Sequence, residues 1–136
     1  MSQPICVCTR LRRATREVSR HYDAALAPAG LNVAQFALLR AVERAGAPSI
    51  GDLAGAVQLD ASTLGRNLRV LERAGLVVLG AGRDQRRRLV ELTGAGQDAL
   101  VRAAPLWAAA QAAMEEKLGD GGRERLFALL GHITAA

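Results

Sequence analysis

A helix predicted between residues 61 and 74 places the strongest constraint on what this chain can fold into. Asp60 can cap its first turn and Gly75 can end it. Its apolar side chains step by four and three residues and therefore share one face: Leu64, Leu68 and Leu71. The opposite face carries Ser62, Arg66, Arg69 and Arg73. The helix must therefore bury one side in a core and expose a row of arginines on the other.

A short helix before it completes a helix-turn-helix pattern. Ser49 followed by Asp52 matches a capping box, and apolar residues between Ile50 and Val57 keep helical spacing. A solvated basic face is the alternative explanation for the arginines of the second helix. No acidic residue is interleaved at the spacing that would pair with them, which favours an anionic partner. A helix of this kind fits the major groove of DNA.

Two short apolar runs after Gly75 predict a β-hairpin. Residues 76–79 (LVVL) and 89–93 (LVELT) are expected to form strands, joined by a loop that contains RDQRRR at positions 83–88. We expect Asp84 to accept a bidentate hydrogen bond from the guanidinium of Arg86. The loop arginines would then lie over phosphates or in a minor groove: Arg83, Arg86, Arg87 and Arg88. The alternative is a basic loop without a partner.

Helices are also predicted on both sides of this region. The first runs from about Ile5 to Leu26 and the second from an Asn32 cap to about Arg44. A long helix is expected over residues 94–118, with a kink at Pro105, and a last helix follows residues 119–122.

The terminal helices have more apolar surface than a small DNA-binding domain needs. We therefore expect them to form a homodimer, as a pseudo-palindromic site would require. The alternative is that they pack only on their own domain. We assign residues 1–30 to an N-terminal dimerisation helix, 31–96 to the DNA-binding region and 97–136 to C-terminal dimerisation helices, in one domain overall.

Composition narrows the function classes. The chain has 136 residues, half of them apolar, a net charge of +5 and a pI near 10.5, which favours a polyanionic partner. Aromatic residues make up 3% of the chain, too few for base-stacking platforms. No segment has the pattern of a membrane span or a signal peptide, so we expect a cytoplasmic protein with no membrane partner.

Catalytic and metal-binding patterns are absent from the sequence. There is no glycine-rich phosphate loop, no metal-ligand spacing and no nucleophile motif near His21 or His132, so we expect neither an enzyme nor a cofactor. Cys6 and Cys8 are two positions apart and do not form a disulfide framework.

The pattern as a whole resembles the MarR family of winged helix-turn-helix transcription regulators. The matching stretches are STLGRNLRVLERAGLV, the Asp84-x-Arg86 motif, and LT-x-x-G formed by Leu92, Thr93 and Gly96. The resemblance covers essentially the whole chain and implies a mainly α fold with a two-stranded β wing. It further implies that Arg86 enters the minor groove, oriented by Asp84. The residues that would face the major groove are Ser62, Thr63, Arg66 and Asn67, although the helical wheel places Asn67 nearer the core side.

The resemblance also suggests a repressor that is released by an oxidant or a small aromatic ligand. Cys8 falls where a peroxide-sensing branch of the family has its reactive cysteine, and Tyr22 where that branch has a tyrosine partner. An inert cysteine is the alternative. A pocket for an aromatic carboxylate would be lined by Arg16, His21, Tyr22 and Trp107. The alternative function is a nonspecific nucleic-acid-binding protein of the nucleoid or RNA-binding type, which would show no preferred site.

Overall fold

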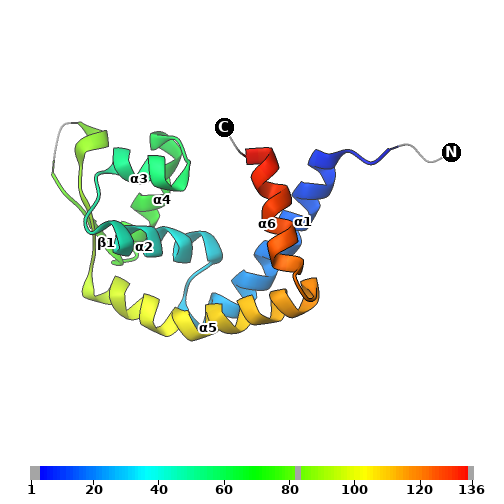
Figure 1. The fold of residues 1–136 in the computed structure, drawn as a ribbon. Coiled ribbons are helices and arrows are strands. Elements are labelled where there is room, and N and C mark those ends of the chain that lie inside the picture. Colours follow the sequence, from blue (N-terminus) through cyan, green and yellow to red (C-terminus); the bar gives the residue numbers. More distant parts are fainter. Residues whose placement is uncertain (1–3, 82–83, 135–136) are drawn as a thin grey trace.

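Each helix and strand predicted from the sequence is present in the computed structural model, which describes residues 4–81 and 84–134 (Figure 1). The elements are α1 (Val7–Leu26), η1 (Ala27–Ala29), α2 (Val33–Ala45), α3 (Ile50–Val57), α4 (Ala61–Arg73), β1 (Val77–Leu79), η2 (Gln85–Arg87), β2 (Val90–Leu92), α5 (Gly94–Leu118) and α6 (Gly122–Thr134). Helices η1 and η2 are single 3-10 turns. The mainly helical fold with a two-stranded antiparallel sheet confirms the predicted fold class.

Side-chain caps set where the helices begin. Asn32 accepts a hydrogen bond from the backbone of Gln35, and the Gln35 side chain accepts one from the backbone of Asn32, which forms a full capping box. At α3, Ser49 accepts from the backbone of Asp52 at 3.0 Å, but the Asp52 side chain makes no return bond to Ser49, so the capping box expected there is only half formed. At α4, Asp60 caps the first turn as predicted. These local contacts explain why the predicted boundaries of these three helices are accurate.

The core lies in one lobe, between α2, α3, α4, the sheet and the first half of α5. Its large and fully buried side chains are Leu26, Leu39, Val42, Ile50, Leu53, Leu64, Leu68, Leu71, Val77 and Val90. The three leucines predicted to form the inner face of α4 are all among them. Burying one leucine stabilises a fold by about 1.5–3 kcal/mol, so α4 is held firmly in the lobe.

The hairpin is attached to the start of α3. The amide of Ile50 donates to the carbonyl of Arg88 at 2.9 Å, and the amide of Val90 donates to the carbonyl of Pro48 at 2.8 Å. The strand register pairs Val77 with Leu92, Val78 with Glu91 and Leu79 with Val90. The hairpin therefore has a fixed position beside α3 and α4.

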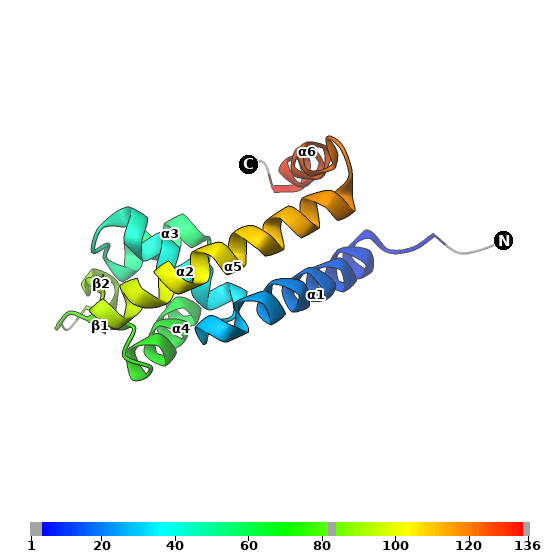
Figure 2. The ribbon, with the colours of Figure 1, turned by 90° about the horizontal axis from the view of Figure 1, so that it is seen from below.

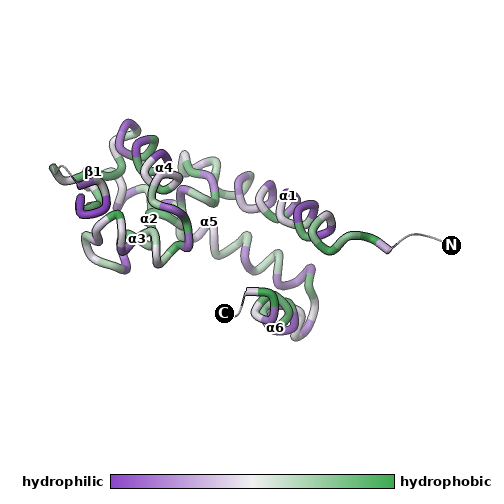
Figure 3. The backbone as a smooth tube through the Cα atoms, turned by 90° about the horizontal axis from the view of Figure 1, so that it is seen from above, coloured by the Kyte–Doolittle hydropathy of each residue, from purple (hydrophilic) through white to green (hydrophobic). Residues whose placement is uncertain are grey.

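Helices α1, α5 and α6 extend from this lobe (Figure 2). Helix α1 packs along α5, whereas α6 follows a turn at Gly119–Gly121 and stands apart from α1. The kink expected at Pro105 does not interrupt α5, which continues as one helix from Gly94 to Leu118. Figure 3 shows hydrophobic residues on α6 and at the start of α1.

Within the described residues, no single helix combines the length and apolarity needed to cross a membrane. One pair meets these criteria jointly, residues 7–29 with α2, but it is bent by 70°. Much of α2 is buried in the core of the lobe.

Candidate nucleic-acid interface

The outer face of α4 is exposed as the sequence predicted. Ser62, Arg66, Arg69 and Arg73 all lie on the surface. Asn67 differs from the expectation, because its side chain is exposed and not turned to the core. It lines a hollow of about 220 Å³ between α4 and the start of α2, together with Asn32 and Gln35. The helical wheel misplaced Asn67 because a wheel gives the angular position of a residue on its helix and not which sides of the helix other elements cover.

Asp60 organises the first turn of α4. Its carboxylate accepts hydrogen bonds from the Ser62 hydroxyl at 2.6 Å, from the Thr63 amide at 2.8 Å and from the Thr63 hydroxyl at 2.9 Å. These bonds, led by that of Ser62, lower the pKa of Asp60 to about 2. Arg66 donates to the Thr63 hydroxyl at 3.4 Å. Ser62, Thr63 and Arg66 are thus arranged side by side at the start of the helix.

Asp84 does not hold the guanidinium of Arg86 in the way we expected. Its carboxylate accepts from the backbone amide of Arg86 at 3.0 Å and lies 3.5 Å from Nε of Arg87. The reason is geometric: η2 turns the chain so that the side chain three residues on, and not two, returns to Asp84. Arg83, predicted as a DNA contact, lies outside the described residues.

Arg88 takes part in the structure of the hairpin. Its Nε–H donates to the carbonyl of Gly80 at 2.6 Å, and its side chain is half-buried. Gly80 belongs to the opposite side of the hairpin, so this bond joins the two sides near the loop. Arg86 and Arg87, in contrast, are exposed. The loop therefore divides its arginines between holding the hairpin together and facing solvent.

The predicted ligand-pocket residues make contacts at different places along α1 and α5. Trp107 is stacked on Phe36, with ring centroids 6.2 Å apart. His21 Nε2 lies 2.8 Å from the carbonyl of Ala110, and the Tyr22 hydroxyl donates to Gln111. Burial, followed by the charge of Glu115, raises the pKa of Tyr22.

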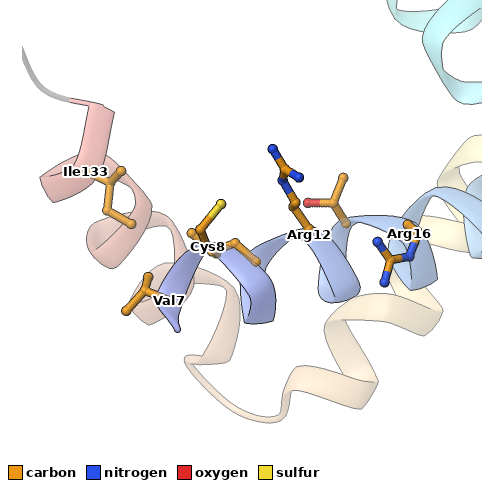
Figure 4. Close-up of a pocket in the computed structure, with 7 residues that line it drawn as sticks. Val7, Cys8, Arg12, Arg16 and Ile133 are labelled. Atoms are coloured by element: carbon orange, nitrogen blue, oxygen red, sulfur yellow. The ribbon is translucent and has the colours of Figure 1, made fainter. Parts of the chain in front are cut away.

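Arg16 instead lines a separate hollow of about 670 Å³ near the start of α1, with Cys8, Arg12 and Ile133 of α6 (Figure 4). The sequence could not separate these sites, because helical spacing does not show which residues α5 and α6 cover.

The structure also separates Cys8 from Tyr22. The two lie about 21 Å apart along α1, from a rise of about 1.5 Å per residue. Both Cys6 and Cys8 are exposed. Hydrogen bonds from Thr9, and then from the amide of Cys8, lower the pKa of Cys6. Cys6 is the N-cap of α1, because the helix begins at Val7 and not at Ile5 as predicted. With the helix start expected at Ile5, Cys6 was not expected to occupy a capping position.

Sequence reasoning also passed over Gly51, in the first turn of α3. A Cβ atom at this position would lie 3.2 Å from the carbonyl oxygen of Arg86. A glycine directly after the first residue of a capped helix was the available signal. Among the residues that the structure describes, no group of three or more His, Cys, Asp or Glu side chains is placed to hold a metal ion.

A helix-turn-helix followed by a β-hairpin defines a winged-helix protein. The model of the MarR family matches residues 29–88. The crystal structure of the M. tuberculosis transcriptional regulator MosR in complex with DNA is 39% identical over 95% of this chain and 96% of that chain, with a TM-score of 0.81. A second MosR structure is 37% identical over 94% of each chain, with a TM-score of 0.78. A comparison with curated proteins found no match.

A more distant structure is that of the transcriptional repressor CouR bound to p-coumaroyl-CoA. It is 26% identical over 96% of this chain and 92% of that chain, with a TM-score of 0.83. The chain belongs to the MarR family of transcriptional regulators. Members of this family are not enzymes, which agrees with the expectation from the sequence.

Proposed function

We propose that this protein is a repressor that binds a pseudo-palindromic operator as a homodimer, with α4 in the major groove and the hairpin as a wing beside it. The observation that carries the proposal is the gathering of exposed arginines from α4 and η2 on one side of the lobe. The MosR relative, 39% identical, was solved in complex with DNA, which supports the same partner for this chain. Arg66 and Arg69 would contact bases or phosphates, as Ser62, Thr63 and Asn67 would from the same helix.

The exposed apolar side chains of α6 support the proposed homodimer. Gly122 is the sole residue of this described helix that is buried, although α6 contains several large apolar side chains. The exposed ones include Phe127 at 60%, Leu129 at 64% and Ile133 at 60%. Apolar surface of this kind is stabilised by a partner. A second copy would cover it and would also fill the neighbouring hollow at the start of α1.

The test of this function is selection of DNA fragments from the source genome, followed by titration of the purified protein with the selected duplex. A regulator should bind its site at least about a thousandfold more tightly than random DNA at moderate salt. A nonspecific nucleic-acid-binding protein would instead show a steep salt dependence and no preferred fragment. Equal affinity for the selected and the random duplexes would show that the protein is a nonspecific nucleic-acid-binding protein.

Arg66→Ala is expected to weaken operator binding by on the order of 1–3 kcal/mol, because it removes a charged donor from the centre of the proposed contact. Fluorescence anisotropy with labelled operator measures the loss. The matched control is Arg102→Ala, which removes the same charge from an exposed position on α5. If the two variants lose equal affinity, Arg66 acts only through net charge and not at the interface.

For the signal, we propose oxidation of the thiols at the start of α1. Both thiols are exposed, and the lowered pKa of Cys6 raises its thiolate fraction. A peroxide would supply the oxygen: the thiolate attacks it, the O–O bond breaks, water leaves after protonation and the cysteine becomes a sulfenic acid. The aromatic-ligand alternative has less support, because Arg16 and His21 line separate hollows and Trp107 is stacked on Phe36.

Peroxide should therefore release the operator from the wild-type protein, and a thiol reductant should restore binding. We expect the Cys6→Ser, Cys8→Ser double variant to stay bound under the same treatment. Each single variant then shows which thiol is needed, and Cys8 remains the prediction from the sequence. Release of the double variant by peroxide would contradict the thiol mechanism. Release by aromatic carboxylates without an oxidant would favour the ligand alternative.

A further inference from the structure

A hollow of about 500 Å³ lies between α4 and η2. It is lined by Ala61, Ser62, Gly65, Arg66, Arg69 and Arg86. Two of its arginines come from α4 and the third from the hairpin loop, so the hollow exists only when the loop rests against the helix-turn-helix. Its small lining residues, Ala61 and Gly65, leave room between the guanidinium groups.

The charged side chains that line this hollow are all arginines. None of the ion pairs formed within residues 4–81 and 84–134 involves Arg66, Arg69 or Arg86. Asp60 is nearby and its negative charge acts on Arg66, but its carboxylate is hydrogen-bonded to Ser62 and Thr63 and not to a guanidinium group. Three guanidinium groups that line one hollow repel each other, and an anion between them would relieve that repulsion. Guanidinium geometry matches the oxygens of a phosphate particularly well.

Arg86 is packed closely against Gly51. A Cβ atom on Gly51 would lie 3.2 Å from the carbonyl oxygen, 3.5 Å from Nε and 3.6 Å from Cβ of Arg86. The backbone of η2 and the Arg86 side chain therefore rest directly on the first turn of α3. The bond from the Ile50 amide to the Arg88 carbonyl, at 2.9 Å, holds the adjoining part of the loop to the same turn.

We infer that the hollow between α4 and η2 is a binding site for phosphate or pyrophosphate groups, and that Gly51 is the residue that positions Arg86 in it. The natural occupant rests on the proposed function and is a phosphate of the DNA backbone next to α4. The same site takes a free phosphate compound when DNA is absent, and that compound competes with the operator. Affinity for a small anion is thus a property of the protein alone and is measurable without DNA.

The probe is inorganic pyrophosphate, titrated into the full-length protein at constant ionic strength with chloride as the balancing anion. We expect saturable binding by calorimetry, with a shift in the NMR signals of the arginine Nε–H groups. Arg86→Ala and Arg69→Ala should each weaken pyrophosphate binding by about tenfold or more, as expected for loss of one charge-assisted contact. Arg102→Ala, outside the hollow, should leave it unchanged.

The positioning role of Gly51 is tested by a matched pair on α3. Gly51→Leu should displace η2 and weaken pyrophosphate binding about tenfold, like removal of Arg86 itself. Gly55→Leu is the control, because a Cβ at Gly55 meets no atom within 4 Å. Both changes improve helix propensity, so α3 itself should persist, as circular dichroism will show. If Gly51→Leu does not fold, Gly51→Ala makes the same test with a smaller displacement.

The outcomes separate this site from the proposed function. Pyrophosphate that binds all the arginine variants equally, or not at all, overturns the phosphate site, even when the operator still binds. Equal binding by the Gly51→Leu and Gly55→Leu variants overturns the role of Gly51. Pyrophosphate binding without any affinity for duplex DNA overturns the proposed function and leaves the site. If pyrophosphate releases more operator than chloride does at the same ionic strength, pyrophosphate and DNA bind at one shared site.

Discussion

Gly96→Ala is expected to destabilise the protein by at least about 3 kcal/mol, the range of severe overpacking. A Cβ at Gly96 would lie 2.1 Å from the carbonyl oxygen of Leu76 and 3.1 Å from its carbonyl carbon. Both atoms belong to the backbone, so no side-chain rotation relieves the clash. The same carbonyl accepts the Thr93 amide at 3.1 Å, which ties it to the start of α5. The first turn of α5 would have to move away from the base of the hairpin.

Gly94→Ala is the matched control, because Gly94 lies in the same helical turn and its Cβ would meet no atom within 4 Å. Alanine there should be neutral or stabilising by up to about 1 kcal/mol. Urea denaturation of the two variants beside the wild type measures the difference. Loss of equal stability in both would mean that the close approach to Leu76 is not the cause.

The contacts among Leu76, Thr93 and Gly96 have a functional consequence as well. The Thr93 hydroxyl donates to the carbonyl of Gly75 at 2.6 Å and accepts from the Gly96 amide at 3.0 Å. It therefore connects the end of α4 to the beginning of α5, the long helix that packs along α1. A shift of α5 would be transmitted through these few contacts to α4, the proposed DNA-binding helix.

Features set by local spacing were predictable from the sequence. The Leu64, Leu68 and Leu71 repeat fixed the buried face of α4, and its arginine row followed on the other side. Caps at Asn32, Ser49 and Asp60 fixed three helix starts, because each cap bonds to a residue three positions along the chain. Both strands were recognised as short apolar runs on either side of a loop.

Features that depend on distant contacts were not predictable in the same way. The carboxylate of Asp84 pairs with Arg87 because of the 3-10 turn, which has no strong sequence pattern. Trp107 faces Phe36 rather than a ligand pocket because α2 and α5 cross there. The contact of Gly51 with Arg86 joins segments far apart in the chain, and its sequence signal was only an unexplained glycine.

Substitutions in the proposed dimer interface are expected to have the second large effect, on the oligomeric state and on operator affinity. Helix α6 stands apart from α1 and contacts its own chain mainly through α5 (Figures 2 and 3). Arg123, in the first turn of α6, pairs with Glu115 of α5 at 2.6 Å. Further along α6, Phe127 and Leu129 are 60% and 64% exposed. Charged groups at these two positions would be tolerated in a single chain and strongly disfavoured in an apolar interface.

Phe127→Asp combined with Leu129→Asp is thus expected to give a folded monomer, detected by sedimentation velocity together with circular dichroism. Operator affinity should fall on the order of a hundredfold or more, because the two half-sites are no longer bound by linked subunits. The variant should then bind a full operator little better than an isolated half-site. Val101→Asp is the control, since Val101 is 73% exposed on α5 and the same substitution there should leave the dimer intact. A Phe127→Asp, Leu129→Asp protein that remains dimeric would show that α6 is not the interface, and a monomer that keeps full affinity would show that operator binding does not need the second copy.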